Sequence, residues 1–202
     1  DASPVEVRIR AVPRENQHIE RWVPHVVWSA AEEACAELVR EERAAGLLRG
    51  RTVLELGSGT GLCGLVCGVL ARGVVLTDGS DEAVAELEMT AGLNPHAHVT
   101  GCALLRWGEP EGLARAVELN GNKLFDVVVG TDVVYEAEFV APLLRTAVDA
   151  LVPGGVLVLA NHKFRFRAFA ETIREATKAL PLVLEEHTLL NDQVDFLVFR
   201  KA

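Results

Sequence analysis

The segment Val53-Leu54-Glu55-Leu56-Gly57-Ser58-Gly59-Thr60-Gly61-Leu62 decides the fold. Its apolar first half predicts a short buried strand, and the residues from Leu62 onward predict a helix. Three alternating glycines join the two elements. Glycine allows a sharp turn and lets the backbone approach a ligand without an intervening Cβ atom. Since open α/β sheets bind ligands at the carboxyl ends of their strands, this loop is a candidate binding site.

A regular alternation of elements surrounds this loop. The sequence predicts strands at 52–56, 74–77, 99–105, 124–130 and 156–160, and helices at 62–71, 82–91, 112–119, 142–151 and 166–180. We expect Asp81 to cap the second of these helices and Pro142 to lie in the first turn of the fourth. Strands that are apolar on both faces and separated by helices indicate a parallel sheet covered on both sides. Two last strands, 182–190 and 194–200, have no helix between them and predict a hairpin with an antiparallel edge strand.

An N-terminal extension precedes this alternation. Residues 5–10 alternate apolar and polar side chains, which predicts a half-buried strand. Residues 29–45 predict a helix that ends near Gly46, with Ser29 and Glu32 as a capping box. We expect one domain over residues 1–202, with the extension at 1–50 and a Rossmann-like core at 51–202.

Composition narrows the class of protein. Twenty Lys and Arg against 29 Asp and Glu give a net charge of −9, which argues against nucleic acid as the main partner. No apolar run reaches the roughly 18–20 residues that span a bilayer, so no membrane partner is expected. Cys63 and Cys67 share a helix face, but no further Cys or His nearby completes a zinc site, so we expect core packing and no metal. Thiols without a disulfide framework favour the cytoplasm, with the nucleus as the alternative.

The glycine loop fits two cofactors. Residues 59–64 also match the GxGxxG pattern of dinucleotide-binding proteins, and Asp78 follows Gly59 by 19 residues. Glu55 favours a methyl donor, because a carboxylate before the loop repels a pyrophosphate and attracts an ammonium or sulfonium cation. The chain is also too short for the substrate domain of a typical dehydrogenase. Asp78 can accept both ribose hydroxyls of either cofactor, or it begins the turn Asp78-Gly79-Ser80.

Five segments together resemble one family. They are Val27-Trp28-Ser29-Ala30-Ala31, Glu55-Leu56-Gly57-Ser58-Gly59-Thr60-Gly61, Thr77-Asp78-Gly79, Leu105-Arg106-Trp107-Gly108-Glu109 and 126–135, which ends in Thr131-Asp132-Val133-Val134-Tyr135. Over about residues 20–200 the chain is similar to the methyltransferase-16 family of non-histone protein lysine methyltransferases. Members of that family act on valosin-containing protein, calmodulin or translation elongation factor 2.

The resemblance implies a class I methyltransferase fold, a seven-stranded Rossmann-like sheet with strand order 3-2-1-4-5-7-6 and a C-terminal antiparallel hairpin. It also implies S-adenosyl-L-methionine as methyl donor. Trp28 would close over the methionine end of the donor, Asp78 would bind the ribose, Trp107 the adenine, and Thr131 would lie at the reactive end. The amino-acid moiety would be held by Glu55 and the loop residues Gly57, Ser58, Gly59 and Gly61.

The acceptor side follows from the same resemblance. Asp132 and Tyr135 would form the family's (D/E)xx(Y/F) signature beside the acceptor lysine, in a chaperone, translation factor or calmodulin-like protein. Ser29 replaces the usual Pro and Thr131 the usual Ala. From the residues alone, Asp132 follows an apolar strand and serves equally well as a helix N-cap, while Trp28 and Trp107 can be packing residues.

Other functions stay open at this stage. A protein histidine or arginine side chain, or a small molecule, is an alternative acceptor. A donor-binding scaffold and a nicotinamide-dependent reductase are the alternatives from other classes. For a lysine acceptor, we expect Asp132 to orient the ammonium while water removes its proton, and Tyr135 to wall the channel.

Overall fold

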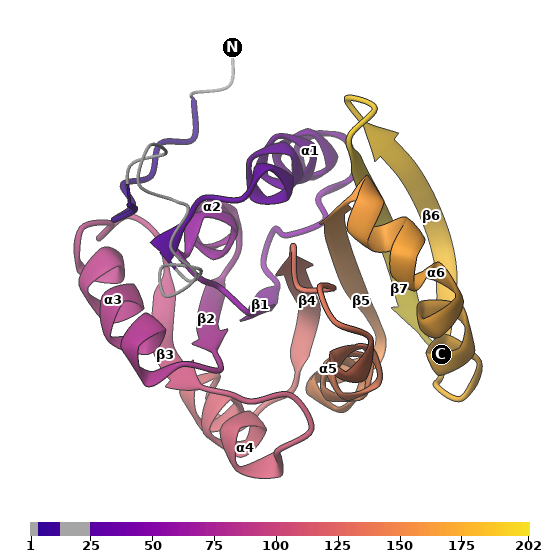
Figure 1. Ribbon diagram of the computed structural model, residues 1–202. Helices are drawn as coiled ribbons and strands as arrows, with labels where there is room; N and C mark the ends of the chain where they lie inside the picture. Colours follow the sequence, from indigo (N-terminus) through magenta and orange to yellow (C-terminus); the bar gives the residue numbers. More distant parts are fainter. Residues whose placement is uncertain (1–3, 13–24) are drawn as a thin grey trace.

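The computed structural model describes residues 4–12 and 25–202. Its elements alternate along the chain as expected, and Figure 1 shows their arrangement. In chain order they are α1 (Ser29–Ala45), β1 (Thr52–Leu56), α2 (Leu62–Leu70), β2 (Gly73–Asp78), α3 (Asp81–Gly92), β3 (Val99–Leu104), α4 (Pro110–Leu119), β4 (Phe125–Thr131), α5 (Ala137–Ala150), β5 (Leu151–His162), α6 (Lys163–Lys178), β6 (Leu182–Leu190) and β7 (Val194–Lys201).

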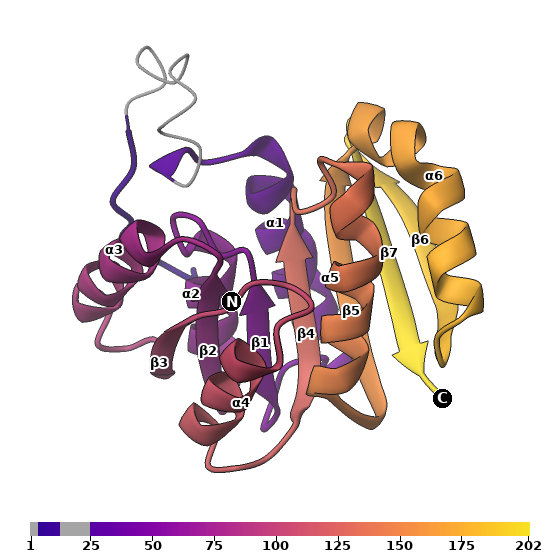
Figure 2. The ribbon, with the colours of Figure 1, turned by 60° about the horizontal axis from the view of Figure 1, so that its bottom comes forward.

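The seven strands form one sheet in the order β3-β2-β1-β4-β5-β7-β6. Strands β1 to β5 pair in parallel, whereas β7 pairs antiparallel with both β5 and β6. Figure 2 shows β7 running against β4 and β5. The expected fold class, strand order and terminal hairpin are therefore confirmed.

Both faces of the sheet are covered, which explains why the central strands are apolar throughout. All five residues of β1 are buried, with Val53 packing among residues of α1, α2 and α3 and Leu54 among residues of α4 and α5 on the opposite face. Figure 1 shows α1, α2 and α3 on one side of the sheet and α4, α5 and α6 on the other. Cys63 and Cys67 are buried in the first of these layers as free thiols, as expected for core residues.

The strand expected at residues 5–10 is absent, although its alternating burial is present. Val5, Val7 and Ile9 are half-buried and the residues between them are exposed. The backbone of this segment is held by a side chain: Arg8 N donates to Asn94 Oδ1 at 2.7 Å, and Asn94 Nδ2 donates to Arg8 O at 2.6 Å. Residues 1–3 and 13–24 of the expected extension lie outside the described residues.

Two expected helix caps and one expected helix start are wrong, whereas α1 begins at Ser29 as expected. Helix α1 has Trp28 at its N-cap with no side-chain cap, so Ser29 forms no capping box. Helix α3 is capped by Ser80, whose hydroxyl accepts from Ala83 N, and not by Asp81. Helix α5 begins at Ala137, which places Pro142 inside the helix, where proline removes one backbone hydrogen bond. Local patterns missed the cap of α1 and the start of α5 because tertiary contacts hold the first turns of these two helices.

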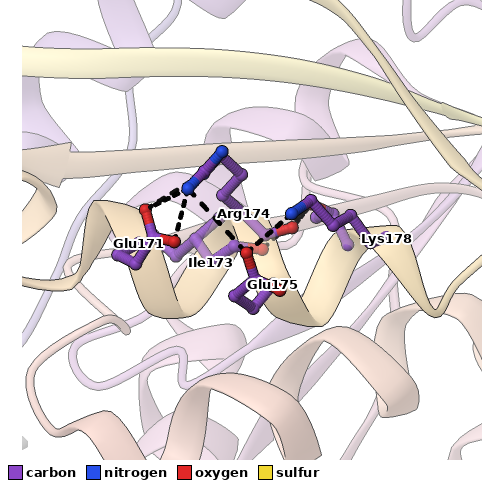
Figure 3. A network of polar contacts seen from close by, with 6 residues as sticks. Glu171, Ile173, Arg174, Glu175 and Lys178 are labelled. Atoms are coloured by element: carbon purple, nitrogen blue, oxygen red, sulfur yellow. Dashed lines mark hydrogen bonds and ion pairs between the residues drawn. The ribbon is translucent and has the colours of Figure 1, made fainter.

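The solvent-facing side of α6 carries a chain of ion pairs, seen from close by in Figure 3. Arg174 pairs with Glu171 and lies 3.8 Å from Glu175, which accepts from Lys178 at 2.7 Å. Exposed pairs at this spacing support the helix only modestly, because water and salt screen them. Ile173, on the opposite side of the helix, is buried in the core and anchors α6 to the sheet.

Replacement of Leu157 tests the core. This side chain in β5 is fully buried between the sheet and the α5–α6 layer. We expect Leu157→Ala to lower the free energy of unfolding by about 2–5 kcal/mol, measured by urea denaturation. Leu184→Ala, at a half-exposed leucine in β6, should cost less than about 1 kcal/mol. Equal losses for the two variants would contradict this description of the core.

Candidate functional site

A cavity of about 940 Å³ lies at the carboxyl ends of β1, β2 and β4. Its volume is in the range of small-molecule sites. Nine of the eleven predicted site residues line it, namely Trp28, Gly57, Ser58, Gly59, Asp78, Trp107, Thr131, Asp132 and Tyr135. Glu55 and Gly61 do not. The sheet topology thus brings together residues that lie more than 100 positions apart in the sequence.

The glycine loop needs all three of its glycines. Gly57, Gly59 and Gly61 have φ values of +67°, +51° and +79°, in the left-handed region that side chains disfavour. A Cβ atom on Gly57 would lie 2.8 Å from Val133 Cγ1 and 3.3 Å from the Trp107 ring, at the cavity wall. A Cβ atom on Gly61 would instead lie 2.8 Å from Leu87 Cδ2, so this glycine packs against α3, away from the cavity.

Asp78 ties the end of β2 to the glycine loop. Its Oδ2 accepts from Gly59 N at 3.0 Å, and its Oδ1 accepts from Ser80 N at 3.2 Å. Burial raises the pKa of the Asp78 carboxyl, and these backbone N–H groups partly offset that effect. Asp78 therefore begins a turn and also lines the cavity, so its place in the turn does not exclude the ribose-binding role predicted from the sequence.

Glu55 lies beneath the loop. Its Oε1 accepts from Gly64 N in the first turn of α2 at 2.9 Å, and its Oε2 is buried without a hydrogen bond. Burial raises the pKa of this carboxyl to about 7, although the Ser58 side chain and Gly64 N–H favour the charged form. The carboxylate does not line the cavity, so Glu55, expected to contact the donor, lies behind the loop instead.

Three aromatic rings form one wall of the cavity. The ring centroid of Trp107 lies 6.3 Å from that of Tyr135 and 6.1 Å from that of Phe139, and the last two are 5.7 Å apart. Such tilted and edge-to-face pairs are favourable arrangements. Tyr135 is nearly half exposed, and partial burial raises the pKa of its phenol. The sequence analysis missed Phe139 because it placed the start of α5 after this residue.

Arg165 was also missed. It lies in the first turn of α6, lines the cavity, and places its guanidinium carbon 4.9 Å from the ring centroid of Trp28, within the range of cation–π contacts. Trp28 thus contacts a cation and does not serve only as an apolar staple for α1. No motif in the sequence singles out Arg165, because its contact depends on the placement of α6 beside the start of α1.

Asp132 joins three elements. Its carboxylate accepts from His162 N at the end of β5 at 3.0 Å and from Ala30 N in the first turn of α1 at 3.3 Å. Its own N–H donates to Ala160 O in β5, and its φ of +53° lies in the left-handed region. Asp132 therefore caps the N-terminus of α1 and not that of α5, the next helix in the sequence.

Neither a metal-binding cluster nor a membrane-spanning helix is found among the described residues. Within residues 4–12 and 25–202, no group of three or more His, Cys, Asp or Glu side chains is placed to hold a metal ion. In the same part of the chain, no helix is long and apolar enough to cross a membrane.

The raised pKa of Glu55 makes stability depend on pH. The folded protein keeps the Glu55 proton up to about pH 7, whereas the unfolded chain loses it near the usual 4.5. The stability contributed by Glu55 is therefore lost as the pH rises between these values. We expect Glu55→Gln to exceed the wild type in free energy of unfolding at pH 8, by up to about 3 kcal/mol, and to show little gain near pH 4.5. Urea denaturation at both pH values measures this, and a difference independent of pH would contradict it.

Sequence comparisons relate the chain to lysine methyltransferases. A family model described as lysine methyltransferase matches residues 14–178. Protein N-lysine methyltransferase METTL21A of Danio rerio is 31% identical over 189 residues, which cover 88% of this chain and 77% of that protein. EEF1A lysine methyltransferase 3 of Mus musculus is 31% identical and covers 72% of this chain, which spans 58% of its length.

Solved structures agree on the fold. Magnesium protoporphyrin IX methyltransferase of Synechocystis, with bound S-adenosylmethionine, has a TM-score of 0.64 at 16% identity, covering 86% of this chain and 80% of its own. A methyltransferase of Pyrococcus furiosus has a TM-score of 0.64 at 21% identity, covering 83% of each chain. These likenesses concern the fold, whereas the family follows from the sequence matches. The chain belongs to the methyltransferase-16 family of S-adenosyl-L-methionine-dependent protein lysine methyltransferases.

Proposed function

We propose that this protein methylates a lysine side chain of a non-histone protein, with the donor in the cavity beside β1 and β2 and the amine beside Asp132. The observation that carries the proposal is the place of Asp132. Asp132 is 7% exposed and lines the same cavity as Tyr135 and the glycine loop. Its carboxylate accepts hydrogen bonds from two backbone N–H groups. A fixed carboxylate at the cavity suits a cationic acceptor.

The residues of the cavity fit S-adenosyl-L-methionine. Gly57 and Gly59 line the cavity with backbone that carries no Cβ atom. Asp78 offers carboxylate oxygens to ribose hydroxyls, and Trp107 offers an indole face to adenine. When bound, the donor supplies an electrophilic methyl group on a sulfonium cation. Trp28, Ser58 and Thr131 line the same space, whereas Glu55 and Gly61 support the loop from behind.

Asp132 orients the acceptor in this proposal. Deprotonating a lysine near pH 7 costs roughly 4 kcal/mol, and a neighbouring carboxylate increases that cost because it stabilises the ammonium form. Asp132 is therefore not the base. It binds the ammonium and holds the amine in line with the methyl group, while water removes the proton. Tyr135 forms part of the wall around the acceptor lysine.

The acceptor protein is inferred from the relatives. METTL21A is named as a protein N-lysine methyltransferase and the mouse relative as an EEF1A lysine methyltransferase, which favours a translation factor as acceptor. A chaperone or a calmodulin-like protein stays a candidate from the family resemblance, and the cytoplasm stays the expected compartment. The EFM7 proteins of Yarrowia lipolytica and Aspergillus fumigatus are named as protein N-terminal and lysine methyltransferases, so an N-terminal amine is the second candidate.

Transfer of a radioactive methyl group into a cell extract tests the proposal. The labelled protein is digested and the methylated residue identified by mass spectrometry. Label on a lysine supports the proposal, and label on an N-terminal amine supports the second candidate. Label only on histidine, arginine or a small molecule would overturn both.

Donor binding should depend on Gly57. Gly57→Ala introduces a Cβ into Val133 and Trp107, and we expect it to weaken S-adenosylhomocysteine binding at least 10-fold in calorimetric titration. Gly46→Ala is the matched control, because Gly46 has nearly the same φ, +66°, but no atom within 4 Å of an added Cβ. It should cost about 1–2 kcal/mol of stability and leave the affinity unchanged. Equal affinity losses in the two variants would contradict the assignment of the glycine loop to donor binding.

Turnover should depend on Asp132. Asp132→Asn removes the charge at nearly constant shape, and we expect kcat to fall about 100-fold, since orientation of the amine is lost, while donor affinity stays within about threefold. Asp195→Asn is a suitable control, because Asp195 is also buried but pairs with His187 in the terminal hairpin, away from the cavity. Full turnover by Asp132→Asn on the identified substrate would contradict the role given to Asp132.

A further inference from the structure

The side-chain amide of Asn161 forms hydrogen bonds with both the backbone N–H and the backbone C=O of Val134. Asn161 Oδ1 accepts from Val134 N at 3.2 Å, and Asn161 Nδ2 donates to Val134 O at 3.0 Å. Asn161 is 1% exposed and Val134 is 2% exposed, so neither pair competes with bulk water. A carboxamide is the side chain that offers a donor and an acceptor side by side, as a neighbouring peptide would.

This clamp lies between the two proposed acceptor-site residues. Val134 directly precedes Tyr135 and follows Asp132 by two positions. The residues on either side of Asn161 contact Asp132 as well: Ala160 O accepts from Asp132 N, and His162 N donates to Asp132 Oδ1. Three consecutive residues at the end of β5 therefore hold the turn that follows β4.

The backbone of this turn needs such support. Asp132 has a φ of +53°, which is unfavourable for a residue with a Cβ atom and persists only where the surroundings hold it. The hydrogen bonds of Ala160 and His162 hold the turn at Asp132 itself. Among the described residues, the hydrogen bonds at Val134 come from Asn161, at the point where the chain leaves the turn toward Tyr135.

We infer that Asn161 is a positioning residue of the acceptor site, which fixes Asp132 and Tyr135 relative to each other through the peptide of Val134. The inference deepens the proposed function and rests on it for the link to turnover. Asn161 does not line the cavity and need not touch either substrate.

Asn161→Asp is the direct test. It keeps the acceptor for Val134 N–H but places a carboxylate oxygen opposite Val134 O, where the amide had donated. Asn94→Asp is the matched control, because Asn94 clamps Arg8 through the same two bonds, is fully buried and lies outside the cavity lining. Asn161→Ala removes both bonds without repulsion and serves if Asn161→Asp does not fold.

Tyr135 is the only tyrosine of the chain, so it reports on the turn without an acceptor protein. A ¹³C-labelled tyrosine gives one ring resonance, whose position depends on the nearby rings of Trp107 and Phe139. We expect the Asn161 variants to shift this resonance and to lower the phenol pKa toward its ordinary value, with kcat reduced at least 10-fold and donor affinity within threefold. Asn94→Asp should change only stability.

Two results would overturn the inference: an unshifted Tyr135 resonance in the Asn161 variants, or an equal loss of kcat in Asn94→Asp. The proposed function fails by a different result, namely that the wild-type protein labels no protein amine. In that case the resonance still decides whether Asn161 sets the position of Tyr135.

Discussion

Carboxylates at the ends of β1, β2 and β4 are held by backbone N–H groups, and the arrangement of the site depends on this constraint. Glu55 accepts from Gly64 in the first turn of α2, Asp78 from the glycine loop, and Asp132 from the first turn of α1. Helix N-termini and loop N–H groups favour negative charge, so acidic side chains can be partly buried here. The same bonds connect each strand to the element beside it.

These contacts give the cavity its chemical character. Asp78 and Asp132 give it acidic side chains, Trp107, Tyr135 and Phe139 give it an aromatic wall, and two loop glycines line it with backbone. A sulfonium or an ammonium cation gains from this field, whereas a pyrophosphate would be repelled. The competing dinucleotide interpretation therefore conflicts with the electrostatics of the site as well as with the family. Burial of Glu55 lowers stability as the pH rises from about 4.5 to 7, which is the energetic cost of placing this carboxyl under the loop.

The sheet and the donor side could be predicted from the sequence because their signals are local. Apolar runs, the terminal hairpin and the alternating glycines each lie within a short segment, and the structure has all of them. The expected cap of α1 and the expected start of α5 were wrong because local capping patterns ignore Asp132 and the aromatic cluster. The strand predicted at residues 5–10 is absent because alternating apolar and polar residues indicate only that one side of a segment is buried. Here the segment is held by Asn94, and this contact requires no neighbouring strand.

The two halves of the site differ in how far apart their bonded residues lie. On the donor side, Glu55 reaches Gly64 across 9 positions and Gly59 reaches Asp78 across 19. On the acceptor side, Asn161 reaches Val134 across 27 positions, His162 reaches Asp132 across 30 and Ala30 reaches Asp132 across 102. A short-range loop leaves a recognisable motif, whereas residues such as Asn161 and Arg165 acquire their roles only from the packing of distant elements. The residues that we propose to position the acceptor are therefore visible in the folded protein and not in the pattern of its sequence.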